Sequence, residues 1–270
     1  MHSKDLQFID TTLRQAGSLI LSAFGGKIQS AQKKEKSQIV TELDLASEKL
    51  IIEAIKKSYP QSSVLAEESG LLVGDATDYW IVDPIDGTSN FANGMPWFGV
   101  MMAHVYQGEA VSSGIYLPVS NEMYLGERYN GAYKNGTRFV VRKEEDIAKT
   151  LVAYGMDGSE VSCSRHKKAE IFEALLPNVL NLRSTNSAVD YAYAAEGRLG
   201  GLINLENRIW DVAPLVPIAL EAGCIVSDVF GKPISFQKEH LNANRNFTLL
   251  LASGPLHAAL LTIIRPILSE

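Results

Sequence analysis

The sequence has little cysteine and no long apolar segment. Its 270 residues include two cysteines, Cys163 and Cys224, which lie far apart in stretches that we expect to be buried. Two such thiols provide no disulfide framework and are typical of core residues in a reducing compartment. No segment approaches the roughly 20 apolar residues that span a bilayer, and no basic leader precedes an apolar stretch at the N-terminus. We therefore expect a cytoplasmic protein.

Clusters of basic residues are also missing. Acidic residues outnumber basic ones by 31 to 25, and the longest basic stretch, residues 33–36, contains Glu35. Proteins that bind nucleic acid by releasing counterions need clustered Lys and Arg. We therefore expect a small-molecule partner, and neither nucleic acid nor a membrane.

The first part of the chain combines helices with an antiparallel sheet. Apolar residues recur at three-to-four spacing in residues 6–24 and 44–60, which predicts two amphipathic helices. Short strands are expected at residues 63–66 and 79–82, and each leads directly into acidic residues. Residues 98–141 alternate apolar and polar positions between turn pairs such as Asn130-Gly131, which predicts an antiparallel meander. The sheet is therefore not purely parallel.

The pattern changes near residue 148. Strands are then expected at residues 151–154, 182–184, 201–204, 225–227 and 248–252, and helices at residues 167–176, 189–196 and 212–222, with a further helix at the C-terminus. Pro217 is expected to kink its helix. No flexible linker separates the two patterns, so residues 1–148 and 149–270 are predicted to form two tightly packed halves, α+β and α/β in style.

Carboxylates concentrate at strand ends and at a helix start. They are Glu67 and Glu68, Asp83 and Asp86, and Asp211. If Glu67, Asp83, Asp86 and Asp211 converge, their mutual repulsion favours a bound divalent cation. Oxygen ligands suit Mg²⁺ or Mn²⁺ better than Zn²⁺, and none of the five histidines stands in a metal-ligand pair.

The loop around these aspartates offers further groups. Pro84 stiffens the backbone, which would direct the Ile85 carbonyl inward as another metal ligand. Gly87 and Thr88 precede a helical stretch at residues 89–93, where free backbone N–H groups favour an anion. A phosphate held by metals and by these amides fits in-line phosphoryl transfer to water.

Each of these features also has an ordinary structural interpretation. Asp86-Gly87 alone is a common turn, and Glu67-Glu68 alone is a typical solvated charge pair. Asp211 and Asp44 each stand where a helix N-cap is expected. Only the combination indicates a functional site.

That combination resembles the inositol monophosphatase family. Residues 83–91 (Asp-Pro-Ile-Asp-Gly-Thr-Ser-Asn-Phe) and residues 210–223, from Trp-Asp-Val-Ala-Pro to Glu-Ala-Gly, are similar to two signature segments of the family, and residues 67–69 to a third. The match runs in order from residues 40–44 to Gly223. The resemblance implies a layered αβαβα sandwich, with an antiparallel N-terminal sheet and a smaller C-terminal α/β sheet. It also implies a lithium-sensitive, homodimeric phosphatase that uses two to three Mg²⁺ ions, with Mn²⁺ as a possible substitute.

The family's site residues carry over by position. Glu67, Asp83, the Ile85 carbonyl, Asp86 and Asp211 would be metal ligands, and Glu68 a supporting carboxylate. The Thr88 hydroxyl, paired with Asp44 and assisted by Glu67, would orient and activate the attacking water, and Gly87 and Thr88 would bind phosphate. No phosphoenzyme is implied. Asp211 would come from the second half, which would also supply the substrate pocket.

The substrate side departs from the family pattern. Asn186 replaces a common glycine, and Asn204 stands where inositol-handling members often carry a carboxylate; Ser187 and Ala188 complete the expected pocket. The expected substrate is thus a small phosphorylated polyol, sugar or amino alcohol, and inositol phosphate itself is in doubt.

Fructose-1,6-bisphosphatase, histidinol-phosphate phosphatase and nucleotide 3′-phosphatase remain alternatives, and the lack of large insertions disfavours the last of them. A regulatory or binding protein that retains the fold is the non-enzymatic alternative, but loss of Asp86, Thr88 or Asp211 would favour it, and all three are present.

Overall fold

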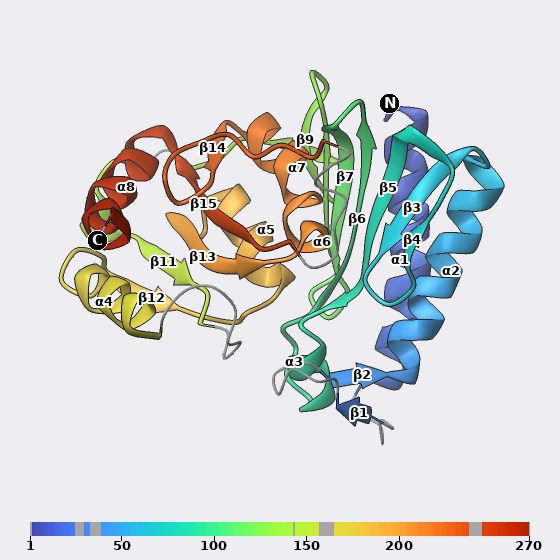
Figure 1. The fold of residues 1–270 in the computed structure, drawn as a ribbon, viewed down its shortest axis with the longest axis horizontal. Helices are drawn as coiled ribbons and strands as arrows, with labels where there is room; N and C mark the ends of the chain where they lie inside the picture. The colour runs from blue at the N-terminus through green and yellow to red at the C-terminus, as the bar shows by residue number, and fades with distance from the viewer. Residues whose placement is uncertain are drawn as a thin grey trace.

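Two β-sheets and the helices around them build the molecule (Figure 1). The computed structural model describes residues 2–24, 30–32, 39–142, 144–156, 165–237 and 245–269. Helices α1 (Lys4–Ala23) and α2 (Glu42–Ser58) cover the outer face of the first sheet, beside a short ribbon of β1 (Ser30–Gln32) and β2 (Ile39–Thr41). Helices α5 (Ala188–Glu196), α6 (Ile209–Val212) and α7 (Leu215–Ala222) lie between the sheets. Helices α4 (Arg165–Leu175) and α8 (Gly254–Ser269) cover the far side of the second sheet, which confirms the predicted αβαβα layering.

The first sheet has the strand order β10-β9-β8-β7-β6-β5-β3-β4. Its strands are β3 (Ser62–Ala66), β4 (Gly70–Leu72), β5 (Asp75–Asp86), β6 (Gly99–Tyr106), β7 (Glu109–Leu117), β8 (Glu122–Glu127), β9 (Gly131–Lys134) and β10 (Thr137–Phe139). Strands β6 to β10 form the antiparallel meander predicted for residues 98–141, and β5 extends it by antiparallel pairing with β6. Strands β3 and β5 are parallel, so the sheet is mixed rather than wholly antiparallel. Because both run the same way, their acidic C-terminal ends meet at one edge.

The second sheet has the order β12-β11-β13-β15-β14. Strands β11 (Leu151–Tyr154), β12 (Asn181–Arg183) and β13 (Gly201–Asn207) are parallel, and β14 (Cys224–Ser227) and β15 (Phe247–Ser253) complete it in antiparallel pairing; the short 3-10 helix η1 (Ile147–Lys149) precedes β11. Three parallel strands place their carboxyl ends at one edge, where α/β sheets commonly bind ligands. This edge lies toward the first sheet's acidic loops, because α5 begins there and contacts Asp86.

The expected kink at Pro217 is wrong. The helical stretch after Asp211 breaks earlier, at Ala213 and Pro214, and divides into α6 and α7. Pro217 lies in the first turn of α7, where a backbone N–H has no partner within the helix, so its ring costs no hydrogen bond.

One core cluster joins the two halves. Leu65 and Met101 of the first sheet belong to the same buried cluster as Ala188, Leu202 and Trp210. Because the two parts share this core, the boundary at residue 148 stays a prediction.

Cys224 is buried, as expected, whereas Cys163 lies outside the described residues. Among the described helices, none has the length and apolar character needed to cross a membrane.

Candidate metal and phosphate site

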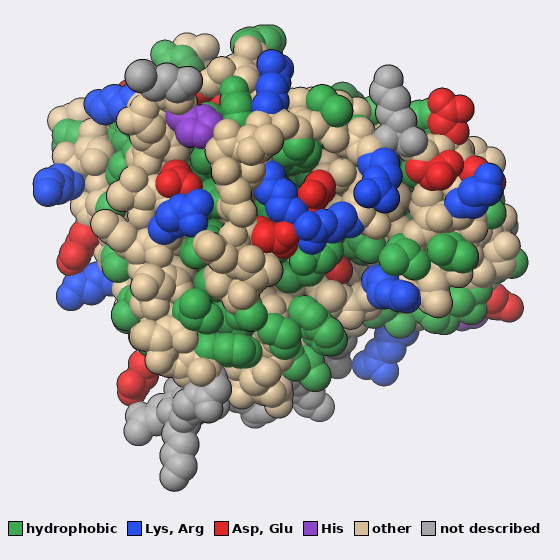
Figure 2. All heavy atoms as spheres, turned by 180° about the vertical axis from the view of Figure 1, so that it is seen from behind, with side chains coloured by type: hydrophobic (Ala, Val, Ile, Leu, Met, Phe, Trp, Pro, Cys, Tyr) green, Lys and Arg blue, Asp and Glu red, His purple; other side chains and the backbone are tan. Residues whose placement is uncertain are grey.

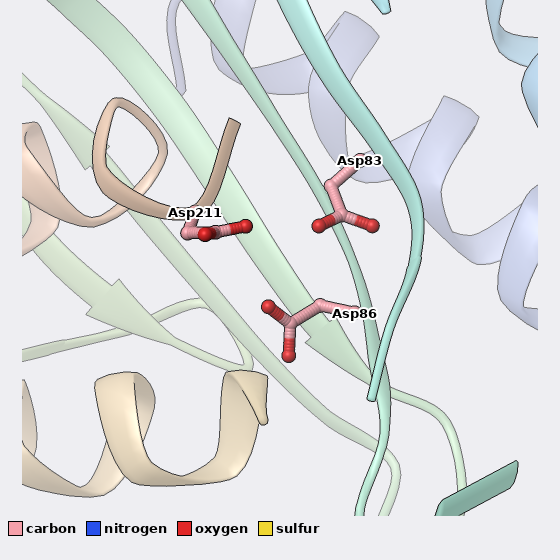
Figure 3. A group of neighbouring side chains, drawn as sticks. All are labelled: Asp83, Asp86 and Asp211. Atoms are coloured by element: carbon pink, nitrogen blue, oxygen red, sulfur yellow. The ribbon is translucent and has the colours of Figure 1, made fainter. Parts of the chain in front are cut away.

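Three aspartates converge between the halves. Asp83 and Asp86 come from the end of β5 and Asp211 from α6. Each offers a carboxylate oxygen, and these oxygens all lie within 4.8 Å of one another. Figure 3 shows the three carboxylates pointing toward a common space. The structure thus brings together three of the residues predicted to bind metal.

Asp83 has the most unfavourable surroundings of the three. Its side chain is buried, and its Oδ1 atom has no hydrogen-bond partner among the described residues. Burial and then the charges of Glu67, Asp86, Asp211 and Asp44 raise the pKa of Asp83 well above its ordinary value. A cation in this space would supply both the missing partner and the opposite charge. The donor set therefore fits an oxygen-preferring divalent ion.

Strand register brings Glu67 to the same edge. Ala66 of β3 stands opposite Val82 of β5, and the Glu67 N–H donates to the Val82 carbonyl at 3.3 Å. Glu67 therefore follows its strand beside Asp83, whose pKa it raises. Glu67, Glu68 and Ser69 form the turn between β3 and β4.

Glu48 is a residue that the sequence reasoning missed. It is buried on α2 and accepts hydrogen bonds from the backbone N–H groups of Glu68, at 2.7 Å, and Ser69, at 3.0 Å, as well as from the Ser69 hydroxyl. The preceding residue of the helix is Ser47, whose hydroxyl donates to the Pro84 carbonyl at 3.0 Å. Helix α2 therefore fixes both acidic loops. The signal was the buried polar stripe Asp44, Ser47 and Glu48 at helical spacing, on a face expected to be apolar.

Gly87 has a backbone that requires glycine. Its φ is +90°, and a Cβ there would lie 2.6 Å from the Trp97 carbonyl oxygen and 2.9 Å from the Ser187 Cβ. It precedes α3 (Thr88–Ala92), close to the helical stretch predicted for residues 89–93. The Thr88 hydroxyl donates to the Ile85 carbonyl at 2.7 Å. The phosphate role of Gly87 and Thr88 and the pairing of Thr88 with Asp44 stay predictions.

The start of α5 contacts the aspartates. Ser187 caps this helix, and the Ala188 N–H donates to the Asp86 carboxylate. Before the cap, the N–H groups of Thr185 and Asn186 donate to Asp190 at 2.8 and 3.0 Å. Burial raises the pKa of Asp190, and the hydrogen bonds from Thr185 and Asn186 oppose that rise. The second half thus supports a metal-ligand candidate of the first.

Asp211 fits both interpretations of its sequence position. Its Oδ2 atom accepts the Arg208 N–H at 2.6 Å, which closes the turn at the start of α6. In Figure 3 its carboxylate also points toward the space that it shares with Asp83 and Asp86. A local helix-capping role and a place among the three aspartates are therefore compatible.

Comparisons with known proteins agree with this geometry. The model of the inositol monophosphatase family matches residues 2–265. The Nus factor SuhB of Vibrio cholerae serotype O1 is 35% identical over 224 residues, covering 81% of this chain and 82% of the relative. The solved extragenic suppressor protein suhB from Bartonella henselae has a TM-score of 0.88 at 26% identity, covering 97% of this chain and 99% of that one. The Thermotoga maritima IMPase has a TM-score of 0.87 at 27% identity and 99% coverage of both chains. An IMPase/NADP phosphatase complexed with Mg²⁺ and phosphate shares the fold at a TM-score of 0.81 and 21% identity, covering 96% of each chain.

Proposed function

The chain belongs to the inositol monophosphatase family, and on that premise we propose that it is a Mg²⁺-dependent phosphatase that hydrolyses a small phosphate monoester. The observation that carries the proposal is the convergence of Asp83, Asp86 and Asp211, in which the buried Oδ1 atom of Asp83 has no hydrogen-bond partner among the described residues. Isolated buried carboxylates are costly, and a set of them with nothing but oxygen donors is typical of magnesium sites.

In this proposal Glu67, Asp83, the Ile85 carbonyl, Asp86 and Asp211 hold two to three Mg²⁺ ions, and Mn²⁺ accepts the same ligands. When bound, the ions lower the pKa of a coordinated water and neutralise charge on the phosphate. Glu68 supports the Glu67 turn through its backbone bond to Glu48. Bound cations would offset the burial and the neighbouring negative charges that raise the pKa of Asp83.

The chain's own groups would position phosphate and water. The N–H groups of Gly87 and Thr88 hold phosphate oxygens, which the left-handed backbone at Gly87 permits. The Thr88 hydroxyl and Asp44 orient the attacking water, and Glu67 assists in accepting its proton. Transfer goes directly to water, without a phosphoenzyme. Asn186, Ser187, Ala188 and Asn204 line the pocket for the alcohol.

A phosphate-release assay tests the proposal. Sugar, polyol, amino-alcohol and nucleotide phosphates are supplied with Mg²⁺, and fructose 1,6-bisphosphate and histidinol phosphate are included as the substrates of the alternatives. We expect release to stop in EDTA and to fall about 10²-fold or more in Asp86→Asn, because a ligand charge and the anchor for the Ala188 N–H are both weakened. Asp10→Asn, on a partly exposed turn of α1, is the matched control and should keep full activity. Lithium inhibition at millimolar concentration is expected from the family. Full activity in EDTA would contradict the proposal.

A regulatory role is the second candidate. The curated relatives at 35% identity are named Nus factors, a name that does not denote an enzyme. On the face shown in Figure 2, acidic and basic side chains are interspersed rather than gathered by sign, so this face carries no broad basic surface. Asp86→Asn separates the two candidates. A regulator would keep its cellular role in this variant, whereas a phosphatase would lose it.

A further inference from the structure

The loop between β12 and α5 joins the second half of the chain to the acidic site. The Thr185 carbonyl accepts the side-chain amide of Asn90, in α3, at 2.8 Å. Three residues later, the Ala188 N–H donates to the Oδ1 atom of Asp86. Both contacts fall on one short segment of the first half, where β5 ends and α3 begins. The position of this loop therefore bears on a candidate metal ligand and on the helix beside it.

Close packing keeps the loop against this segment. A Cβ at Gly87 would lie 2.9 Å from the Ser187 Cβ, so the two chains meet where only a glycine fits. The Asn90 amide that binds the loop also donates to the Trp97 carbonyl, at 2.9 Å, in the chain that leads from α3 to β6. Since closely packed groups have little room to move independently, a shift of the loop would be passed on to Asp86.

Asp190 holds the loop in place from the first turn of α5. It is 4% exposed, and its Oδ2 atom accepts the backbone N–H groups of Thr185 at 2.8 Å and Asn186 at 3.0 Å. Ser187 caps the helix, so these N–H groups belong to the two residues before the cap. The arrangement extends the capping box, in which an acidic residue of the first turn binds the backbone of the cap itself. One buried carboxylate thus fixes the conformation of the loop.

The loop backbone requires such a restraint. Asn186 has a φ of +48°, in the left-handed region that residues other than glycine rarely adopt, and such a conformation persists where surrounding contacts determine it. The bond to Asp190 fixes the Asn186 N–H. The Met156 N–H and the Ser184 hydroxyl donate to its side-chain oxygen, at 3.2 and 2.9 Å. Without the Asp190 carboxylate, two backbone N–H groups would lose their acceptor, and the loop would be free to relax away from Asp86.

We propose that Asp190 is a positioning residue: by fixing the loop before α5, it holds the Ala188 N–H against Asp86 and thereby sets the affinity of the acidic site for Mg²⁺. The inference rests on the proposed phosphatase function. A hydrogen bond to one carboxylate oxygen restricts rotation of the group, so this N–H favours one orientation of the Asp86 side chain. Removing such a support typically costs about 10- to 100-fold in metal affinity. Asp190 would thus act on a bound metal from outside its ligand set.

Asp190→Ala tests the inference, because it removes the acceptor of both N–H groups. The rise of Tm across a Mg²⁺ titration, without substrate, gives the Kd for Mg²⁺ and also reports the stability of each variant. We expect a Kd about tenfold weaker than that of the wild type. Phosphate release from phenyl phosphate should fall at low Mg²⁺ and recover at high Mg²⁺.

Asp190→Asn is the milder variant. It keeps an acceptor oxygen but loses the charge, and a charge-assisted hydrogen bond is about twice as strong as a neutral one. We therefore expect about half the effect on a logarithmic scale, a Kd roughly threefold weaker. This variant carries the test if circular dichroism shows that Asp190→Ala does not fold, and a wild-type Kd in Asp190→Asn would then contradict the inference.

Asp228→Ala is the matched control. The Asp228 Oδ1 atom accepts the N–H groups of Phe230 and Lys232, at 2.9 and 2.8 Å, in the turn after β14. The variant loses the same two kinds of bond at the opposite edge of the second sheet from β12, and it should keep the wild-type Kd. A role of Asp190 in stability alone would lower the Tm of Asp190→Ala and leave its Kd unchanged.

The outcomes separate the inference from the function on which it rests. If the wild type binds Mg²⁺ and hydrolyses phenyl phosphate but a folded Asp190→Ala binds Mg²⁺ equally well, the inference alone is wrong. If the wild type binds no Mg²⁺ and releases no phosphate, the proposed function fails and the inference fails with it. An equally weakened Kd in Asp190→Ala and Asp228→Ala would also contradict the inference, because the effect would then follow from lost stability rather than from the position of Asp86.

Discussion

At the scale of single residues, the acidic site combines groups that are unstable together in the absence of a cation. Asp83 is buried among like charges, and one of its oxygens has no partner among the described residues. Such an arrangement lowers the stability of the folded chain unless something binds there. Function and stability are therefore opposed at this residue, a common property of active sites.

Replacing Asp83 by Asn tests this opposition. The neutral amide removes a buried charge, so we expect the metal-free protein to become more stable by about 1 kcal/mol or more, a rise in Tm of about 2–4 °C for a chain of this size. The wild type should gain stability on addition of Mg²⁺, and the variant should gain much less, because binding to the native state alone stabilises it. Thermal unfolding in EDTA and in Mg²⁺ measures both effects. An unaltered Mg²⁺ response in the variant would contradict the metal assignment of Asp83.

Glu48 is a positioning residue and acts through the turn that follows Glu67. Glu48→Gln keeps one acceptor oxygen but weakens the charge-assisted bonds to the N–H groups of Glu68 and Ser69. We expect a loss of about 1.5–3 kcal/mol of stability. We also expect an apparent Mg²⁺ affinity roughly tenfold weaker, with activity partly restored at high Mg²⁺. The control is Glu53→Gln, on the exposed face of the same helix. If added Mg²⁺ restores nothing, Glu48 has only a structural role.

At the scale of elements, α1 is tied to the first sheet by a histidine between two carboxylates. The ring nitrogens of His104 in β6 lie 2.8 Å from Asp5 of α1 and 2.9 Å from Asp78 of β5. The Tyr59 hydroxyl also donates to Asp5, at 2.6 Å, and the His104 ring stacks on Trp80. Burial lowers the pKa of His104, but the bonds to Asp5 and Asp78 outweigh it, so the pKa lies above the ordinary 6.5.

This contact predicts a defined pH dependence. Because folding raises the pKa of His104, its contribution to stability is complete below 6.5 and is lost as pH rises through the folded value. Burial raises the pKa of Asp5, but hydrogen bonds, first from His104, lower it overall to below 3.8. The contribution of Asp5 to stability is therefore lost only as pH falls through that lower value. The difference in unfolding free energy between the wild type and His104→Gln should thus be largest between about pH 4 and 6.5 and shrink above it. Urea unfolding across that range measures it. His166→Gln, exposed on α4, is the control, and a difference independent of pH would refute the assignment.

At the scale of the whole molecule, the site depends on both halves at once. Asp86 and Gly87 belong to the first half, and the groups that contact them, the Ala188 N–H and the Ser187 side chain, belong to the second. Near the other end of α5, Glu196 binds Lys134 of β9 at 2.9 Å and accepts the Tyr124 hydroxyl at 2.7 Å. Helix α5 therefore connects an ion-pair cluster on the first sheet to the acidic site.

The shared core predicts that the chain unfolds as one unit. Leu65 and Met101 pack in the same cluster as Ala188 and Trp210, so separating residues 1–148 from 149–270 would expose apolar surface on both. We expect a single calorimetric transition, with the van't Hoff enthalpy equal to the calorimetric one. Residues 1–148 expressed alone should show no protected amides in hydrogen exchange. Two transitions, or a folded first half, would show that the halves are independent domains.

Local patterns in the sequence predict most of the helices and strands and the chemistry of the acidic loops. The three-to-four spacing of Leu6, Ile9 and Leu13 predicts α1, and the strands of the meander follow from alternation and turn residues. The carboxylates after two strands, together with Asp211, indicate an oxygen-ligand metal site before any distance is known. These features are readable because each depends on neighbours in the chain.

Contacts between distant parts of the chain determine which groups meet. The parallel pairing of β3 with β5, the role of Glu48, the helix break at Pro214 and the orientation of the Asn204 amide all depend on contacts between residues distant in sequence or on the choice of hydrogen-bond partner. A sequence records that Asn204 carries both a donor and an acceptor, but the N–H of Glu206 at a bulge decides that the acceptor is used within the protein. Local patterns specify the elements and the reactive groups, whereas packing selects the partners of each polar atom, because every buried donor and acceptor must be satisfied by whatever the fold brings within reach.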